Sequence, residues 1–254
     1  MRDLDIPQLS KNIQSWISGY LKAANATKVV VGMSGGIDSS VTGALCMKAL
    51  GKQNVFGLIL PCESISADIA DAKMVVDHLG IEYELIDLTP KYKEFLKDMP
   101  IGNENNTLAK ANLKARLRMV TLYYYCQCLT QCLVAGTGNR AEMAIGYFTK
   151  YGDGGVDFEP LGLLYKSEVK ALAKTLNIPD NIIKKAPSPG LWPGQTDEGE
   201  IGLSYDTIDE ILYRIDYNLD FDGLDIDKVK RVKDLMRKAQ HKLRSPPSYI
   251  IKQD

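Results

Sequence analysis

Val29-Val30-Val31-Gly32-Met33-Ser34-Gly35-Gly36-Ile37-Asp38-Ser39-Ser40 is the stretch of this sequence that decides the fold. The β-branched residues 29–31 predict a buried strand, and the apolar spacing over residues 37–50 predicts a helix. Between them, Gly35 and Gly36 lack Cβ atoms, so the backbone can take a positive φ and bring its N–H groups close to an anion. The helix that follows adds the positive end of its dipole. We therefore expect a strand, an anion-binding turn and a helix.

The polar side chains of this turn favour a phosphate that is bound together with a metal ion. Ser34 and Ser39 supply hydroxyl donors, whereas Asp38 would repel bare phosphate and is better explained as a ligand of Mg²⁺. The pattern of a Walker A loop and its lysine are absent from the sequence. The turn resembles the SGGxDS loop of the N-type ATP pyrophosphatases, which implies cleavage of ATP between the α and β phosphates. The alternative is an ordinary glycine turn.

The rest of the chain alternates between apolar runs and helical patterns. Strands are predicted at 54–60, 81–88 and 132–135, and helices at 7–24, 67–79, 106–129, 166–176, 205–217 and 225–242. This alternation argues for right-handed βαβ units and a parallel sheet. We expect an α/β fold, a doubly wound, Rossmann-like parallel sheet with flanking helices, in one domain over residues 1–254. The helix at 7–24 is expected to pack on the sheet.

Three segments have features of their own. The helical region from Pro90 to Leu129 is interrupted near residues 100–103, and its second part is apolar on more than one face. One face can cover the sheet, and the other fits either a subunit interface or a fully buried helix. Residues 147–157 form either a surface loop or a ligand-holding loop. Three prolines and three glycines exclude regular structure over residues 186–199, which is typical of a lid or binding loop.

Glu142 is a second acidic residue of interest. Asn139 is expected to be the N-cap of a new helix, with Glu142 at its third position, where a carboxylate is electrostatically favoured. Glu142 therefore has a purely structural explanation. In doubly wound sheets, however, ligands bind outside the carboxyl ends of the strands, where the loops that carry Asp38 and Glu142 would converge. The two carboxylates could share a Mg²⁺ there.

Composition disfavours several other classes of protein. The 31 basic and 32 acidic residues nearly balance, so no global field draws the chain to nucleic acid or membrane. Residues 1–5 contain no apolar signal core, and no stretch is long and uncharged enough to span a bilayer, so we expect a cytoplasmic protein with neither partner. Five cysteines in such a chain favour reduced thiols. Cys126, Cys128 and Cys132 are interpreted as buried small hydrophobes rather than metal ligands.

Further motifs follow in a characteristic order: Tyr147-Phe148-Thr149-Lys150-Tyr151-Gly152-Asp153-Gly154-Gly155-Val156-Asp157, Lys166, Lys185-Ala186-Pro187-Ser188, residues 204–209 and His241-Lys242. Together with the phosphate turn they make nearly the whole chain resemble the ammonia-dependent NAD synthetase family. The resemblance implies a two-step reaction. The nicotinic acid carboxylate of deamido-NAD attacks the α-phosphate of ATP and releases pyrophosphate, and ammonia then displaces AMP to give NAD. The sequence contains no glutaminase domain, so free ammonia is the expected nitrogen source.

The same resemblance implies roles for individual residues. ATP is expected to bind at Gly32, Met33, Ser34, Gly35, Gly36, Ile37, Asp38, Ser39, Thr137, Lys166 and Ser188. Asp38 and Glu142 are the expected Mg²⁺ ligands, and with Lys166, which would stabilise charge on pyrophosphate, they are the expected catalytic residues. Deamido-NAD is expected to bind at Arg116, Lys150, Asp157, His241 and Lys242. A homodimer is implied, with the deamido-NAD site near the subunit interface.

The sequence departs from the family pattern in several places, and two rival functions fit parts of it. Many bacterial members have threonine in place of Ser188, and the turn 136–139 replaces a Gly-Thr-Asp-His version, so roles of that Asp or His do not transfer. Residues 191–199 resemble another branch of the family. The rivals are another ATP pyrophosphatase, by GMP synthetase-like amidation or tRNA thiolation, and a non-catalytic nucleotide-binding protein. A tRNA enzyme should show a basic face or a zinc pair, which this composition disfavours.

Overall fold

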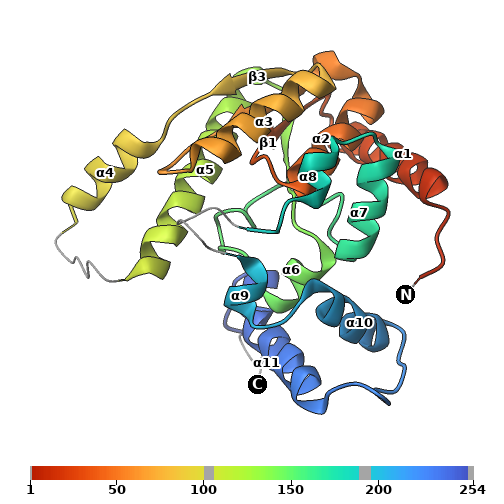
Figure 1. Cartoon of the computed structure of the whole chain (residues 1–254). Helices are drawn as coiled ribbons and strands as arrows, with labels where there is room; N and C mark the ends of the chain where they lie inside the picture. The colour runs from red at the N-terminus through yellow and green to blue at the C-terminus, as the bar shows by residue number, and fades with distance from the viewer. Residues whose placement is uncertain (1, 100–105, 189–195, 251–254) are drawn as a thin grey trace.

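A computed structural model describes residues 2–99, 106–188 and 196–250, and its sheet has helices on both faces (Figure 1). Within these ranges the strands are β1 (Lys28–Gly32), β2 (Val55–Ile59), β3 (Glu82–Leu85) and β4 (Cys132–Ala135), in the order β3-β2-β1-β4. All three neighbouring pairs are parallel, which confirms the predicted α/β fold. The third strand is shorter than the predicted residues 81–88, because at the sheet edge it pairs only with β2 before the chain turns into a helix.

Each helix that the apolar spacing predicts is present, within a few residues at each end. The helices of the described residues are α1 (Ile6–Ala23), α2 (Ile37–Leu50), α3 (Ser66–Leu79), α4 (Thr89–Lys97), α5 (Thr107–Leu129), α6 (Arg140–Ile145), α7 (Lys166–Thr175), α8 (Asp180–Lys184), α9 (Asp197–Ile201), α10 (Tyr205–Asp216) and α11 (Ile226–Leu243), with a short 3₁₀ helix, η1 (Lys52–Asn54). Gly80 ends α3 with a φ of 64°, a conformation that glycine adopts at helix ends without strain.

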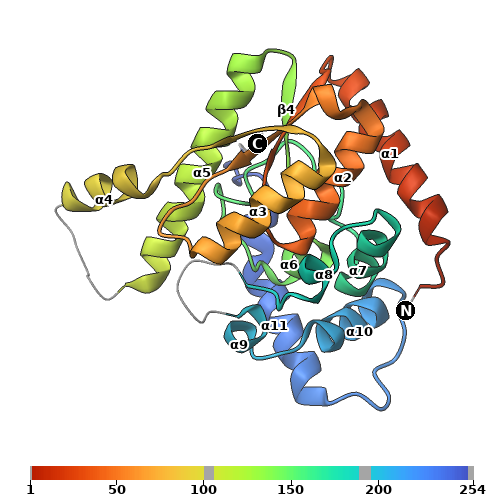
Figure 2. The same ribbon diagram turned by 45° about the horizontal axis from the view of Figure 1, so that its top comes forward.

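The central strand β1 is buried on both faces, as expected for a parallel sheet that is covered twice. Val29 and Val31 belong to one core, together with residues of α1, α2, α3 and α7. Val30 belongs to the other core, beneath α4 and α5. Figures 1 and 2 show α5 on the opposite side of the strands from α2. This two-sided packing fixes the direction of β1 and therefore the position of the turn that follows it.

The first helix differs from its prediction. Instead of lying on the strands, α1 packs mainly against α2 and α7. Its buried residues Ile17 and Leu21 reach the same core as the strands, but α2 and α7 already cover that face of the sheet. The helix therefore forms an outer layer, and our expectation of its place was wrong.

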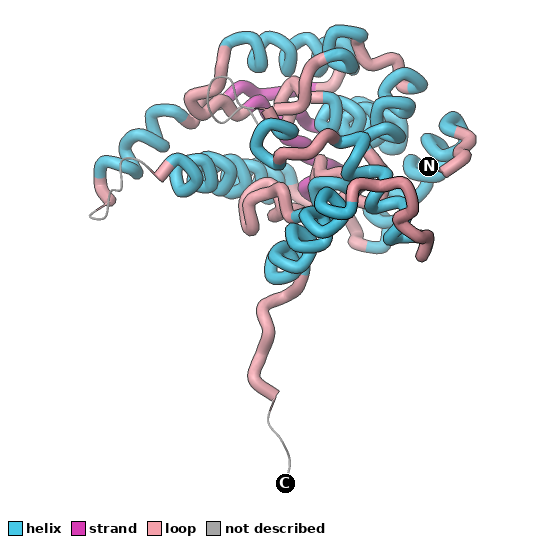
Figure 3. The backbone as a smooth tube through the Cα atoms, turned by 60° about the horizontal axis from the view of Figure 1, so that its bottom comes forward, coloured by secondary structure: helices cyan, strands magenta, loops and turns pink. Residues whose placement is uncertain are grey.

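A smaller core joins α6 to the last helices of the chain. Ile145 of α6, Ile208 of α10 and Val232 of α11 are buried in it. Figure 1 shows these helices and α9 gathered on one side of the sheet, below it in that view. After α11 the chain runs away from the body of the molecule (Figure 3). This arrangement brings the C-terminal helices against the helix that carries Glu142.

The loop over residues 186–199 is only partly as predicted. Residues 189–195 lie outside the described residues, as does the predicted interruption at residues 100–103. Asp197, however, begins α9, so regular structure is present where we excluded it. The hydroxyl of Thr196 accepts a hydrogen bond from the amide of Gly199, and acidic residues in the first turn favour the helix N-terminus.

The three cysteines predicted to be buried differ from one another. Cys126 is buried in α5, Cys132 is half-buried in β4, and Cys128 is exposed, so the prediction was wrong for Cys128. Positions two residues apart on a helix point in nearly opposite directions, and only one face of α5 meets the sheet.

In the described part of the chain, no helix is both long and apolar enough to cross a membrane.

Candidate active site

The candidate site lies at the carboxyl ends of β1 and β4. The chain leaves β1 for α2 and β2, whereas β4 lies on the other side of β1 and leads to α6. Such a switch in strand order opens a crevice between the two loops, and ligands of doubly wound sheets bind there. The structure thus brings the turn before α2 and the start of α6 together, as the sequence predicted.

The turn between β1 and α2 has the geometry of an anion-binding loop. Gly35 has a φ of 77°, and a Cβ atom there would lie 2.6 Å from the carbonyl oxygen of Asp68 in α3, so only glycine fits. Gly36 precedes α2, and no side chain of the described residues caps that helix. The first backbone N–H groups of α2 therefore lack side-chain hydrogen-bond partners. They lie at the end of the helix that borders the crevice.

Lys166 carries a buried positive charge into this site. Its side chain is 2% exposed, and its Nζ lies 2.5 Å from Oδ2 of Asp38 and 3.6 Å from Oε1 of Glu142. Burial alone would lower the pKa of Lys166, but these two carboxylates raise it above its ordinary value. Lys166 is therefore a cation at neutral pH. The sequence alone did not indicate this burial, because a lysine near a helix start is more often exposed to solvent.

Asn139 connects the two predicted metal ligands. Its Oδ1 accepts a hydrogen bond from the backbone N–H of Glu142 (3.1 Å), and its backbone N–H donates to Oε2 of Glu142 (3.2 Å). These two bonds confirm the predicted helix cap. Its Nδ2 also donates to Oδ1 of Asp38 at 3.1 Å. The sequence did not predict this last bond, because its two partners are 101 residues apart and meet only where the start of α2 lies beside the N-cap of α6.

Tyr205 and Asp197 are two members of the site that sequence reasoning missed. The hydroxyl of Tyr205 lies 3.0 Å from Oε1 of Glu142 and 2.7 Å from Oδ2 of Asp197. Its ring lies beneath Lys166, with Nζ 4.6 Å from the ring centroid. Tyr205 belongs to the motif of residues 204–209, which gave a signal for the family but none for its contacts. Asp197 fell in the loop that was predicted to lack regular structure.

The charges of the site fit a divalent cation. Asp38, Glu142 and Asp197 supply three carboxylates against the single ammonium of Lys166, so negative charge is in excess. Burial, and next the charge of Asp38, raise the pKa of Glu142 to about 7. No three potential ligand side chains of the described residues are close enough to hold a metal by themselves. Mg²⁺ commonly binds through one or two carboxylates with phosphate oxygens as further ligands, and the pair Asp38 and Glu142 suits that mode.

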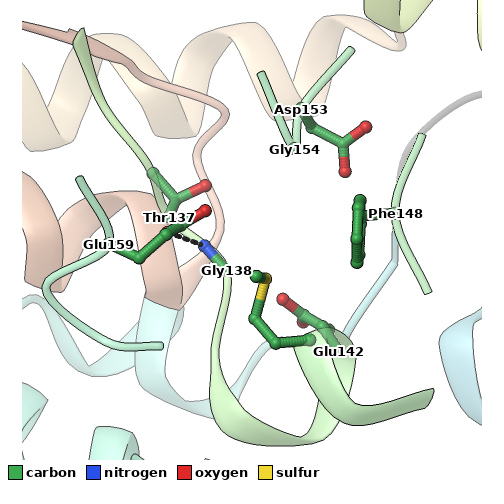
Figure 4. A pocket seen from close by; sticks show the side chains of 8 residues that line it. Thr137, Gly138, Glu142, Phe148, Asp153, Gly154 and Glu159 are labelled. Atoms are coloured by element: carbon green, nitrogen blue, oxygen red, sulfur yellow. Dashed lines mark hydrogen bonds between the residues drawn. The ribbon is translucent and has the colours of Figure 1, made fainter. Parts of the chain in front are cut away.

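A cavity of about 40 Å³ lies beside Glu142. Figure 4 shows Glu142, Phe148 and Asp153 on one side of it and Glu159 on the other. Oε2 of Glu159 accepts a hydrogen bond from the amide of Gly138 at 3.0 Å, and a Cβ atom at Gly136 would overlap the Glu159 carboxylate. Burial raises the pKa of Glu159 to about 8. Glu159 thus holds the turn after β4, and its ionisation is unfavourable in the folded protein.

We expect Glu159→Gln to stabilise the protein increasingly as the pH rises from 5 to 8. A carboxyl group whose pKa is about 8 in the folded state and near 4.5 when unfolded costs stability over that interval, because the unfolded chain loses the proton first. Glutamine keeps an acceptor for Gly138 without titrating. Thermal unfolding at several pH values should show that the stability advantage of the variant grows by about 3 to 4 kcal/mol between pH 5 and pH 8. If the stabilities of the two proteins changed with pH in parallel, this prediction would be wrong.

Four of the five residues predicted for deamido-NAD lie in one group. The guanidinium of Arg116 donates to the carbonyl oxygen of Lys150, whose Nζ donates to the carbonyl oxygen of His241 at 2.5 Å. Lys242 donates to the carbonyl oxygens of Gly146 and Phe148, both at 2.6 Å. These contacts join α5, the loop after α6 and the end of α11. The structure therefore brings the predicted basic residues together.

The remaining predicted residues occupy different surroundings. The carboxylate of Asp157 accepts hydrogen bonds from the hydroxyl of Tyr123 (3.0 Å) and the amide of Val134 (2.7 Å), which tie its loop to α5 and β4. Thr137 lines the cavity beside Glu142. Ser188 is exposed and directly precedes the residues that the structure does not describe.

Comparison with known proteins shows similarity over nearly the whole chain. Residues 9–246 match a family model described as NAD synthase. The NH(3)-dependent NAD(+) synthetase of Hyperthermus butylicus is 44% identical over 255 residues, which cover 97% of this chain and 91% of that protein. The structure of NMN synthetase from Francisella tularensis has a TM-score of 0.90 at 36% identity, covering 98% of this chain and 100% of that one. The NH3-dependent NAD synthetase from Campylobacter jejuni has a TM-score of 0.82 at 34% identity, covering 97% and 100%.

Proposed function

We propose, because this chain belongs to the NAD synthase family, that it is an ammonia-dependent NAD synthetase. It converts deamido-NAD, ATP and ammonia to NAD, AMP and pyrophosphate. The observation that carries the proposal is the cluster of Asp38, Glu142 and Lys166 at the open start of α2. The family disfavours GMP synthetase-like amidation and tRNA thiolation. A protein that only retained a nucleotide would not need two carboxylates beside its phosphates.

The first step makes the nicotinic acid carboxylate reactive. A carboxylate is a poor electrophile at neutral pH, so its oxygen attacks the α-phosphorus of ATP, and the bond to pyrophosphate breaks. We place the ATP phosphates against the turn of residues 32–39, with Thr137 and Ser188 as further contacts. The N–H groups at the start of α2 would hold the phosphates in place. The fixed ammonium of Lys166 would stabilise the charge that develops on pyrophosphate.

We assign Mg²⁺ to Asp38 and Glu142. When bound there with ATP, the ion would neutralise phosphate charge and orient the phosphates for attack. The charge excess of the site and the orientation of both carboxylates by Asn139 support this assignment. A resident cation would also offset the burial and the repulsion from Asp38 that raise the pKa of Glu142.

The second step transfers nitrogen to the adenylated carboxylate. Ammonia attacks the carbonyl carbon, AMP leaves, and the amide of NAD forms with loss of one proton. The cavity beside Glu142 admits molecules the size of water or ammonia but no nucleotide group. We assign deamido-NAD to Arg116, Lys150, His241 and Lys242, whose clustering supports a common site. Asp157 is proposed with them, in a loop that it holds against β4.

We also propose that the chain acts as one domain, in a homodimer, in the cytoplasm. Leu108, Val120 and Tyr124 are large apolar residues on α5 that are exposed in the single chain. Val120 and Tyr124 lie one turn apart on the second apolar face that the sequence indicates, and a second copy would cover it. Arg116 also lies on α5, so such an interface would run beside the proposed deamido-NAD site.

A second candidate substrate is the corresponding mononucleotide. The Francisella tularensis structure, described as an NMN synthetase, has the higher TM-score of the two structures compared. Amidation of a nicotinic acid mononucleotide would use the same ATP chemistry and the same acidic cluster. The two candidates differ only in whether the protein binds the adenylyl half of the dinucleotide.

One assay with two substrates tests the proposed function. Purified protein, ATP, Mg²⁺ and ammonium are incubated with deamido-NAD or with nicotinic acid mononucleotide, and NAD, NMN, AMP and pyrophosphate are measured. We expect NAD with stoichiometric AMP and pyrophosphate, and a kcat/KM at least tenfold higher for deamido-NAD. A preference for the mononucleotide would establish the second candidate. Release of ADP and orthophosphate would rule out the adenylation mechanism for both.

A further inference from the structure

The side chain of Tyr205 lies where three helices of the site meet. It comes from the start of α10, and its hydroxyl lies between Glu142 of α6 and Asp197 of α9. The side chain is fully buried, and its ring also faces the ammonium of Lys166. A hydroxyl in such a place is fixed by its surroundings and can fix its neighbours in turn.

We propose that Tyr205 is a positioning residue, whose hydroxyl holds the Glu142 carboxylate in the orientation in which it binds a divalent cation together with ATP. The proposal rests on the proposed function in one respect, since it takes Glu142 as a metal ligand. Tyr205 itself would touch neither the metal nor the substrate.

Glu142 is held at both of its oxygens. Oε2 accepts the amide of Asn139 at 3.2 Å, and Oε1 accepts the hydroxyl of Tyr205 at 3.0 Å. A carboxylate has about four acceptor positions, so these two bonds leave room for a metal ion. With one bond alone the carboxylate could rotate about its terminal torsion. Carboxylate ligands of metals are commonly held by such outer hydrogen bonds, and removal of one typically weakens metal binding.

Asp197 makes the hydroxyl of Tyr205 adjustable. A phenol has one proton, yet carboxylate oxygens lie on two sides of it. Rotation of the O–H bond passes the proton between Asp197 and Glu142 without moving a heavier atom. The other oxygen of Asp197 is buried and has no hydrogen-bond partner among the described residues. Tyr205 thus lies between the two carboxylates, and its proton can be donated to Glu142 without any movement of the helices.

Binding of Mn²⁺ tests this proposal without requiring turnover. Mn²⁺ is titrated into the protein in the presence of a non-hydrolysable ATP analogue, and free Mn²⁺ is followed by electron paramagnetic resonance. Tyr205→Phe keeps the ring beneath Lys166 and removes only the hydroxyl. We expect Mn²⁺ to bind about 10- to 100-fold more weakly to this variant than to the original protein. In the same variant, kcat should fall while the KM for deamido-NAD changes little.

Tyr165→Phe is a matched control. Tyr165 is equally buried, and its hydroxyl donates to Asp216 at 2.8 Å, outside the acidic cluster. This variant loses a comparable hydrogen bond and should bind Mn²⁺ within about twofold of the original protein. An equal effect of both substitutions on Mn²⁺ binding would overturn the proposal, because the loss would then be general destabilisation.

A double-mutant cycle shows whether Tyr205 acts through Glu142. On a Glu142→Gln background, Tyr205→Phe should change Mn²⁺ affinity by less than about threefold, because the group that it positions is already changed. If Tyr205→Phe weakened Mn²⁺ binding on this background as much as it does in the original protein, the proposal would be overturned. Tyr205→Phe leaves the buried charge of Asp197 without its hydrogen bond. If that variant does not fold, Tyr205→Phe combined with Asp197→Asn removes the charge and should show the same loss of affinity.

These measurements separate the inference from the proposed function. A protein that forms no NAD but loses Mn²⁺ affinity on Tyr205→Phe would refute the function and support the positioning role. A protein that forms NAD and binds Mn²⁺ equally well with and without the hydroxyl would refute the positioning role alone.

Discussion

Replacement of Asp38 with alanine is expected to abolish NAD formation while the protein remains folded. We assign Asp38 to the metal that orients the ATP phosphates, and its Oδ2 holds Lys166 at 2.5 Å. Loss of the carboxylate would remove a metal ligand and release the ammonium from its position. Electrostatic stabilisation of this kind is commonly worth 10² to 10³ in rate for a single group, so we expect a loss of about 10³-fold or more in kcat.

The fold should tolerate the change because the site keeps enough negative charge. Lys166 would still lie near Glu142, and the side chain of Asp38 is not part of either sheet core. Pyrophosphate release measures the activity, and thermal unfolding measures the fold. Asp180→Ala is the control, since the exposed side chain of Asp180 pairs with the exposed Lys184, and this change should leave both quantities unchanged. Unchanged activity of the Asp38 variant would exclude Asp38 from the metal site.

Replacement of Lys166 with methionine is expected to damage both activity and stability. Methionine has a similar length but no charge, so Asp38, Glu142 and Asp197 would lose the cation that lies among them. Removal of one partner from a buried ion pair costs about 3 to 5 kcal/mol when the remaining charge is not compensated. We expect kcat to fall by about 10² to 10³, because the charge that develops on pyrophosphate would no longer be stabilised.

Divalent cations distinguish this explanation from simple loss of packing. Mg²⁺ should raise the melting temperature of Lys166→Met by more than that of the original protein, since the ion takes the place of the missing charge. Lys166→Arg keeps the charge and should recover most of the stability but not the rate, because its planar head group reaches the carboxylates differently. A methionine variant that is as stable as the original protein would contradict the electrostatic role of Lys166.

The parts of the site that follow from local sequence could be predicted. The turn with Gly35 and Gly36 depends on residues next to each other, and the cap formed by Asn139 and Glu142 depends on a spacing of three residues. Both are present in the structure. The sheet follows equally well, because its strands are apolar runs between helical patterns. The residues assigned to deamido-NAD came from resemblance, and their individual roles stay predictions.

Contacts across long stretches of chain could not be predicted. The bonds from Asn139 to Asp38 and from Tyr205 to Glu142 arise only when separate helices pack, and no local pattern encodes them. The helix at Asp197 had a local signal, the threonine before it, but the neighbouring prolines and glycines outweighed that signal. The exposure of Cys128 depends on which face of α5 meets the sheet. Each miss therefore concerns tertiary packing or a weak local preference.

The separation of the site residues along the chain also bears on synthesis of the protein. The ammonium of Lys166 lies 128 positions from Asp38, and Tyr205 lies 63 positions from Glu142. Contacts between such distant positions form only after the intervening chain has closed into a loop. A nascent chain can therefore build β1 and its turn early, yet it cannot complete the acidic cluster until α10 has left the ribosome. A chain that ends before residue 205 therefore lacks part of this cluster.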